Sequence, residues 1–476
     1  GTGGASPITL TALDGGQIGN IGTGNGTVST ITAGAGSAIT LRADELSVAS
    51  GFAYELNTTG VLTIEPNGGR FVDAFEWNGN LTGGDFVGSG SLNGFTVKGL
   101  ASVGGLTLGK AGNTSNITIA EDATIAGPIQ LFGQDVALNG ALTASGNSTA
   151  VDNRIVIAAA GRVTQSASGA LTANGLALAG SGSFDLTNTS NDVSVLAAGS
   201  SSERVRSLAY VNTDELTIGS VNPTGIYAND AVLIETLTGD LNITEDINTT
   251  STASDAIVLN AGKDKDVSES ASFYDGSGGN IVISDGVSIS VGTGGRGILY
   301  TGAVAGSTRV TDTVGSGTGR FRYASDEATT NYVSPLGDGL YAIYREQPTI
   351  TLKGVDESVV YGTEPLFDVS ATGMQNGDSV AQSLGQLPTV TLMDGGSTAS
   401  RNVNGYFDVR RDHGNVAAYT MDLGADGSSK VGYAFSYDDT GEVTVTPKAL
   451  SAVINDDAKF EGLADNLNYF QTHVAP

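Results

Sequence analysis

The amino-acid sequence predicts an all-β protein that begins with a right-handed parallel β-helix, and a repeated pattern of short strands is the first observation behind this prediction. Between residues 116 and 286, brief runs of alternating apolar and polar β-formers recur, each followed by a turn of Gly, Asn, Asp or Ser. Their starts are 16 to 25 residues apart. Three short strands and three turns need a coil of about 20 residues, as in a β-solenoid. The runs begin at Ile117, Val136, Ile155, Leu176, Val193, Leu216, Val232, Ile257 and Ile281.

The composition is the second observation. The 476 residues include 69 Gly and no Cys, and 39% of them are hydrophobic. The apolar residues alternate with polar ones and do not recur with helical spacing, which disfavours both long helices and disorder. A thin core that continues from coil to coil suits this composition better than one thick core. The lack of Cys excludes disulfides, thiolate metal sites and Cys nucleophiles.

Two longer turns, residues 69–79 and 262–279, interrupt the repeats and carry aromatic side chains in a chain that is 6% aromatic. Aromatic rings exposed on a polar solenoid stack on the apolar face of a sugar, so these turns are the predicted contact surface. The alternative is that the rings pack under the loop and cover the core of a wider coil, because large aromatics are more often buried. The candidate binding residues are Arg70, Phe71, Phe75, Trp77, Phe273 and Tyr274.

The domain organisation follows from a change in composition after Gly297, where tyrosines become frequent. We expect this aromatic-rich segment to cap the β-helix, residues 1–345, because an open end exposes unpaired strand edges. A small β-rich module of β-grasp or Ig-like fold is predicted for residues 346–448. Its opening, residues 349–362, recurs about 100 positions later. Residues 449–476 therefore read as the start of a second, truncated module, and we expect the natural protein to continue.

The charge limits the possible partners. The formal net charge of −28 repels phosphate groups over the whole surface, so nucleic acid and anionic lipid are excluded as partners. No run of 18 apolar residues is present, so we expect no membrane insertion. The acidity favours solubility and a monomer. Weak Ca²⁺ binding at the acidic turns is the other interpretation, but no loop carries the regular spacing of oxygen ligands that a strong site requires.

The sequence carries no pattern of catalytic residues. The acidic residues at the turns, Asp135, Asp152, Asp192 and Asp214, share no clear register along the coils, and the acidic group at residues 240–266 is interpreted as a solvated face. His413 and His473 are isolated. We therefore predict a non-enzymatic protein with no catalytic residues, no metal site and no cofactor. The rival prediction is a polysaccharide-processing β-helix enzyme, a lyase or hydrolase, which needs clustered carboxylates beside Arg or Lys.

Several segments of the sequence resemble those of a known protein family. The coils around residues 191–198 and 216–222 resemble filamentous-haemagglutinin-like exoproteins of two-partner secretion systems. Residues 320–344 resemble the segment that ends the β-helix in many of these adhesins, and residues 360–363, Val-Tyr-Gly-Thr, are similar to MBG modules of YGX type. The family's N-terminal secretion domain and its C-terminal anchor are not found, so the chain resembles an interior piece of such a protein.

This resemblance implies an extracellular role. We expect an adhesin or biofilm-matrix segment, secreted or on the cell surface of a Gram-negative bacterium, in which a stiff rod presents loops. The expected partners are an extracellular polysaccharide or the surface of a host or neighbouring cell. For the full-length protein, the resemblance also implies an outer-membrane secretion partner. A purely structural spacer without any ligand is a further alternative.

Overall fold

The computed structural model describes residues 6–12, 17–18, 28–46, 53–77, 95–146, 149, 152–267, 276–408 and 417–451. The chain divides into two compact units. The first consists of Gly1–Thr351, Ala371–Leu387 and Asp426–Ser436, and the second of Leu352–Ser370, Pro388–Ala425 and Tyr437–Pro476. Residues 371–387 and 426–436, from within residues 346–448, belong to the first unit.

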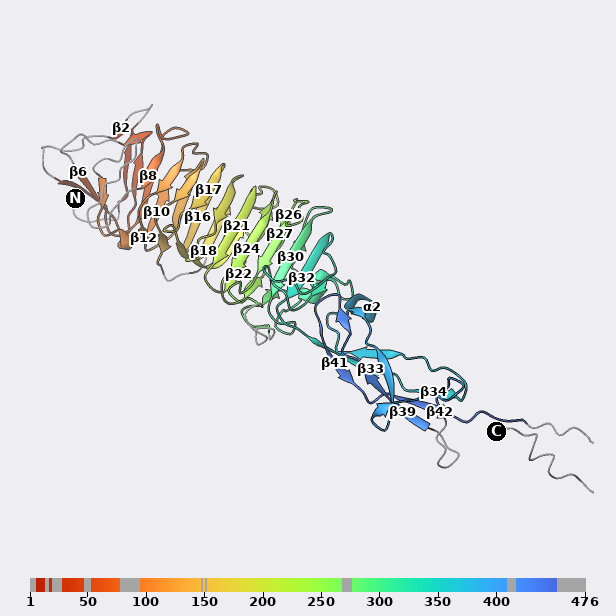
Figure 1. The fold of residues 1–476 in the computed structure, drawn as a ribbon. Coiled ribbons are helices and arrows are strands. Elements are labelled where there is room, and N and C mark those ends of the chain that lie inside the picture. Colours follow the sequence, from red (N-terminus) through yellow and green to blue (C-terminus); the bar gives the residue numbers. More distant parts are fainter. Residues whose placement is uncertain are drawn as a thin grey trace, which may run out of the picture. The chain divides into compact units, whose positions relative to one another are not determined.

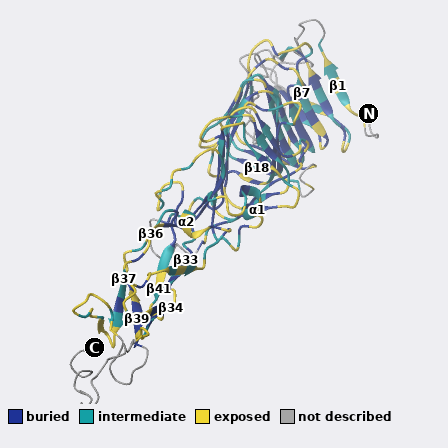
Figure 2. Ribbon diagram, turned by 90° about the vertical axis from the view of Figure 1, so that its right-hand side faces the viewer, coloured by how far each residue is buried: buried dark blue, intermediate teal, exposed yellow. Residues whose placement is uncertain are grey.

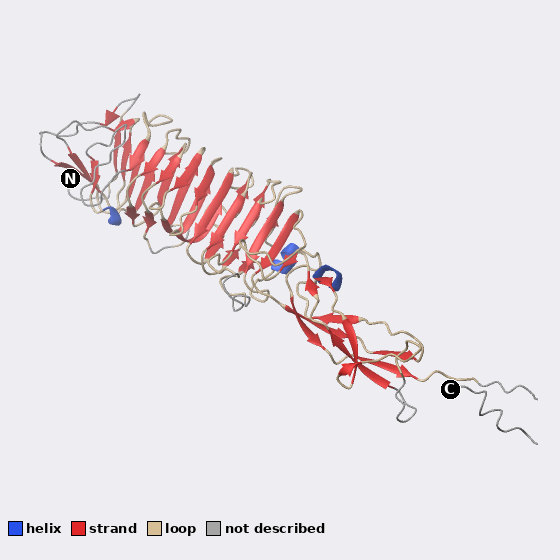
Figure 3. Ribbon diagram, viewed as in Figure 1, coloured by secondary structure: helices blue, strands red, loops and turns tan. Residues whose placement is uncertain are grey.

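The first unit is a parallel β-solenoid, and two long sheets form its walls (Figures 1 and 3). Sheet I has 16 strands. Its main path is β1 (Ile8–Thr11), β4 (Ile39–Arg42), β7 (Val61–Glu65), β10 (Gly105–Leu108), β13 (Ile129–Gly133), β16 (Arg154–Ala159), β18 (Leu171–Ala179), β20 (Asp192–Ala198), β22 (Leu216–Ile218), β25 (Leu241–Ile243) and β28 (Ile281–Ile283). Its side branches are β12 (Ala123–Ile125), β15 (Leu142–Ala144), β23 (Ile226–Ala228), β26 (Ile247–Thr249) and β29 (Ile289–Ser290).

Sheet II has 11 strands and begins at β8. Its strands are β8 (Phe75–Trp77), β11 (Ile117–Ile119), β14 (Val136–Leu138), β17 (Arg162–Gln165), β19 (Ser183–Leu186), β21 (Ser207–Asn212), β24 (Val232–Thr236), β27 (Ile257–Asn260), β30 (Arg296–Thr301), β32 (Gly339–Tyr344) and β31 (Phe321–Arg322). Smaller sheets join β2 (Gln17–Ile18) with β5 (Glu45–Leu46), and β3 (Val28–Thr32) with β6 (Ala53–Asn57) and β9 (Phe95–Val97). The all-β, parallel solenoid predicted from the sequence is confirmed.

The core of the first unit is a set of ladders of apolar side chains, one residue from each coil. Successive strands pair in register, so inward positions stack directly on one another. One such ladder in sheet II is buried along its length: Ile117, Val136, Val163, Phe184, Leu208, Val232 and Ile257. Figure 2 shows the strands lined by buried residues and the turns exposed. A continuous thin core therefore runs through the stack.

Coil length varies along the stack. Ile117 pairs with Val136, which is a coil of 19 residues, whereas Gly297 pairs with Leu340, a coil of 43 residues. The additional residues form loops and the short helices η1 (Leu100–Ser102) and α1 (Val310–Val314). The two later segments of the first unit contribute helix α2 (Val380–Ser383) and the antiparallel pair β36 (Leu384–Gln386) and β40 (Ser428–Ser429).

The second unit contains a five-stranded mixed sheet. Its order is β34 (Glu357–Val360), β42 (Glu442–Thr446), β39 (Ala417–Leu423), β37 (Val390–Asp394) and β38 (Ser397–Thr398), with β34 parallel to β42 and the other pairs antiparallel. Its core comprises Val359, Leu392, Ala417, Tyr419, Met421, Val443 and Val445. A further three-stranded sheet joins β35 (Val369–Thr372), β33 (Thr349–Gly354) and β41 (Ala434–Asp438).

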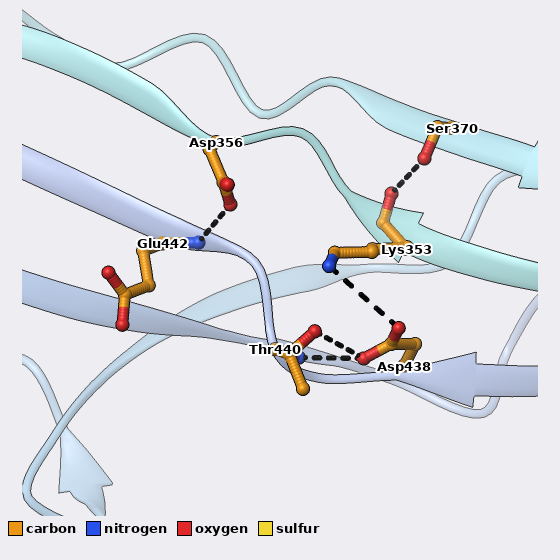
Figure 4. Close-up of polar contacts among 6 residues, drawn as sticks. All are labelled: Lys353, Asp356, Ser370, Asp438, Thr440 and Glu442. Atoms are coloured by element: carbon orange, nitrogen blue, oxygen red, sulfur yellow. Dashed lines mark hydrogen bonds and ion pairs between the residues drawn. The ribbon is translucent and has the colours of Figure 1, made fainter.

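Polar contacts fix the turns of the second unit (Figure 4). Asp438 accepts hydrogen bonds at Oδ1 from the backbone N–H and the hydroxyl of Thr440, at 3.0 and 2.6 Å. The Nζ atom of Lys353 lies 3.9 Å from Oδ2 of the same carboxylate. Asp356 accepts a 2.9 Å bond from the backbone N–H of Glu442. These carboxylates are therefore engaged in holding turns.

Candidate functional site

The aromatic cluster predicted to bind a sugar lies in the core of the first unit. Phe75 and Trp77 are the first and last residues of β8, and they pair in register with Ile117 and Ile119 of the buried ladders. The exposed fractions of Phe71, Phe75 and Trp77 are 5%, 6% and 1%. This burial corrects the expectation that the rings are exposed and agrees with the alternative, in which they fill a wide coil.

The chain around Phe71 is tied down as well. Its ring centroid lies 5.2 Å from that of Phe75, and its carbonyl accepts a 2.9 Å bond from the hydroxyl of Ser115. The neighbouring Arg70 is exposed. Phe273 and Tyr274, the other candidate binding residues, lie outside the described residues. A ligand at either insertion stays a prediction.

The acidic turns have a structural role in the stack. Several turn aspartates accept a hydrogen bond from a backbone N–H of the following coil, at donor–acceptor distances of 2.6–2.9 Å. Each bond satisfies a donor at a corner, where the strand ladder is interrupted. The pairs are Asp44 with Gly68, Asp122 with Ala141, Asp135 with Arg162, Asp240 with Asn280, and Asp246 with Ser288. These carboxylates therefore stabilise the register of the coils.

The described residues contain no group of three or more His, Cys, Asp or Glu side chains arranged to hold a metal ion. His413 and His473 lie outside the described residues. Six cations of the solenoid pair with a carboxylate: Arg42 with Glu65, Lys98 with Glu55, Arg162 with Asp185, Arg206 with Asp230, Lys263 with Glu235, and Arg309 with Asp285. These pairs join residues of different coils, so they too hold the stack together.

Three arginines lie at the end of sheet II. Arg296 of β30 and Arg322 of β31 form no ion pair within the described part of the chain, and neither does Arg320, which precedes β31. A segment that we call the strap, residues 331–338, lies against these arginines. Arg322 donates to the carbonyls of Ser334 and Pro335 at 3.3 Å, and Arg296 donates to that of Leu336 at 3.2 Å.

Tyrosine rings accompany these arginines. The guanidinium carbon of Arg322 lies 5.3 Å from the ring centroid of Tyr332 and 5.5 Å from that of Tyr341, and that of Arg320 lies 5.8 Å from Tyr341. Such distances are those of cation–π contacts. The sequence interpretation treated this stretch only as a cap. The signal that would have shown more is the run Arg320-Phe-Arg322 in a chain with few basic residues.

Comparison of the chain with models of protein families, with curated proteins and with solved structures found no match. In the part of the chain that the structure describes, no helix has the length and apolar character needed to cross a membrane.

Proposed function

We propose that this chain is a segment of a non-enzymatic, extracellular bacterial adhesin or biofilm-matrix protein, in which the solenoid is a stiff element that presents loops to a polysaccharide or cell surface. The observation that carries the proposal is the continuity of the stack. Paired strands and apolar ladders join successive coils, and turn carboxylates and ion pairs add further contacts between several of them, so bending the stack breaks many contacts together. Stiffness of this kind suits a spacer better than a catalyst.

The same proposal includes the finer features of the fold and the cellular context. We propose a right-handed coil, since parallel strands joined by crossovers adopt that hand almost without exception, and a β-grasp or Ig-like topology for the second unit. The protein is secreted or held at the surface of a Gram-negative cell, with an outer-membrane secretion partner for the full-length chain. It acts as a monomer without a cofactor.

The experiment that tests the absence of catalysis is a screen of the purified chain against acidic and neutral polysaccharides. The expected result is no new reducing ends and no unsaturated sugar products, because the turn carboxylates are engaged with backbone N–H groups. Turnover of any polysaccharide assigns the chain to the rival class of β-helix enzymes. A glycan array then separates adhesin from spacer, since a spacer without a ligand binds nothing on it.

A further inference from the structure

We propose that the outer face of sheet II, at the end of the coil stack, binds a sugar residue that carries a single carboxylate, with Arg296 and Arg320 as the groups that recognise it. This proposal rests on the proposed function, because it names the class of glycan that the adhesin contacts. The proposed ligand is a sugar acid within an otherwise neutral glycan.

Register places the arginines on one face. Gly297 and Leu340 pair, and a side-chain carbon added at Gly297 would lie 2.5 Å from Leu340, so these two positions point into the core. Side chains alternate along a strand, so Arg296 points outward. Arg322 pairs with Ile343, and Phe321 between the two arginines is fully buried, so Arg320 and Arg322 share the outer face as well.

Gly339 lies next to both arginines. Gly339 pairs with Arg296 in the sheet. It has a φ of +90°, and a methyl group added there would lie 2.6 Å from Nη1 of Arg320. The guanidinium of Arg320 therefore occupies the space that a side chain at position 339 would fill, beside the strand that carries Arg296. Two guanidinium groups on one face match the paired oxygens of a carboxylate.

The charged side chains of this face also favour an acidic ligand. Arg296 and Arg320 have no carboxylate partner within ion-pair distance among the described residues. Asp338, which is exposed, is the one acidic side chain of the strap. The chain as a whole carries a charge of −28, which repels a polyanion. Two arginines without a carboxylate partner, on a protein that is acidic as a whole, therefore favour one carboxylate over a chain of them.

Two tyrosine rings lie near the arginines. Tyr332 of the strap and Tyr300 of β30 are both partly exposed. Burial raises the pKa of Tyr300 to about 12, so its hydroxyl stays protonated at neutral pH and is able to donate a hydrogen bond. A tyrosine ring offers an apolar face to the CH groups of a sugar and a hydroxyl to its oxygens. The same face thus provides contacts for both the acid group and the ring of a sugar acid.

The simpler interpretation is that the arginines only hold the strap. It accounts for Arg322, which is 2% exposed and whose guanidinium donates to four backbone carbonyls. It accounts for one nitrogen of Arg296. It does not account for Arg320, which forms no hydrogen bond to a carbonyl of the strap in the described structure and remains half-buried against Gly339.

The experiment is calorimetric titration of the full chain with cellobiouronic acid and with cellobiose, two disaccharides that differ in one carboxylate. We expect the acid to bind about tenfold or more tightly than the neutral sugar, which corresponds to about 1.4 kcal/mol. Arg320→Ala and Arg296→Ala should each remove most of this preference. Arg206→Ala is the matched control, because it removes a charge from another coil of sheet II. It should leave both affinities unchanged within about twofold.

Arg320→Lys and Gly339→Ala keep the test decisive. The lysine variant retains the charge without the planar fork and should lose part of the preference. In Gly339→Ala the added methyl group displaces the guanidinium of Arg320. This variant should lose the preference for the acidic sugar although its positive charge is intact. Unchanged thermal unfolding of Arg320→Ala shows that the loss is one of binding. The proposal is overturned if the two sugars bind with equal affinity or if the acid does not bind. It is also overturned if Arg206→Ala loses as much of the preference for the acid as Arg320→Ala. Binding of neutral glycans alone overturns this site and leaves the adhesin function standing, whereas cleavage of a polysaccharide overturns that function.

Discussion

The hydroxyl of Tyr323 donates a hydrogen bond of 2.9 Å to Oδ2 of Asp378, a residue 55 positions later in the chain. Tyr433 donates to the same oxygen at 2.9 Å, and the Nδ2 atom of Asn376 donates to the Tyr323 hydroxyl at 3.0 Å. The ring centroids of Tyr323 and Tyr433 are 4.4 Å apart. Because Asp378 is 7% exposed, this buried network joins three distant segments of the chain within the first unit.

Removal of one hydroxyl from this network should destabilise the first unit. In Tyr323→Phe the ring packing is retained, but Asp378 loses one of its two tyrosine donors and Asn376 loses an acceptor. A buried polar group without its partner costs about 1–3 kcal/mol, so we expect a loss of this size in the free energy of unfolding, measured in urea. Tyr227→Phe, whose half-exposed ring lies under Arg204, is the control and should change stability little. An equal loss in both variants contradicts a special role for the network.

The carboxyl of Asp378 should give the first unit a distinct pH dependence. Burial raises the pKa of Asp378, and the hydrogen bonds from Tyr323 and Tyr433 and the charge of Arg322 lower it in part. A raised pKa means that the folded state binds the proton more strongly than the unfolded state. The contribution of this group to stability is therefore fully present below the unfolded pKa and is lost as the pH rises through the folded pKa.

The comparison of wild type with Asp378→Asn isolates this effect from the general relief of acidic repulsion. We expect the stability of the wild type relative to the variant to increase as the pH falls from neutral toward the unfolded pKa, because only the wild type takes up the proton. Chemical unfolding at a series of pH values measures it. A difference between wild type and variant that stays constant with pH contradicts the raised pKa.

Arg345 should be among the most sensitive positions of the first unit. The residue is 1% exposed, and its guanidinium donates to the carbonyls of Ala261, Gly279 and Ser277. Burial lowers its pKa to about 10, so it remains charged at neutral pH. In Arg345→Met these buried carbonyls lose their donor, and we expect a loss of at least about 1–3 kcal/mol in unfolding free energy. The control Arg309→Met removes an exposed ion pair with Asp285 and should cost at most about 1 kcal/mol.

The strand pattern predicted the solenoid but not which of the two sheets each strand belongs to. Of the nine predicted runs, those at Ile117, Val136, Val232 and Ile257 lie in sheet II, and those at Ile155, Leu176, Val193, Leu216 and Ile281 lie in sheet I. Alternation with period two is identical on every wall of the coil. Only the pairing of strands tells one wall from another, and pairing depends on loop lengths that a single sequence does not fix.

The candidate site shows the same limit. Aromatic residues at 71, 75 and 77 stand out in the sequence, but the choice between an exposed patch and a wide core depends on which neighbours they pair with. The pairing of β8 with β11 decides it, because Phe75 and Trp77 then stack on the buried Ile117 and Ile119. The face with Arg296 and Arg320 was not predicted, because residues 24 apart meet only through the pairing of β30 and β31 with β32.

Replacement of Trp77 with Ala tests the assignment of this ring to the core. The side chain is 1% exposed and lies at the end of a strand whose partner residue, Ile119, is fully buried. Removal of a buried aromatic leaves a cavity and costs about 3–5 kcal/mol, so we expect a loss of this size in the free energy of unfolding. Val72→Ala is the control, since Val72 is 54% exposed and its truncation should have a small effect. Binding of cellobiouronic acid should be unchanged at temperatures where the variant is folded, because Trp77 and Arg320 lie at opposite ends of sheet II. A variant with unaltered unfolding and lost binding to glycans would instead return the ligand site to this cluster.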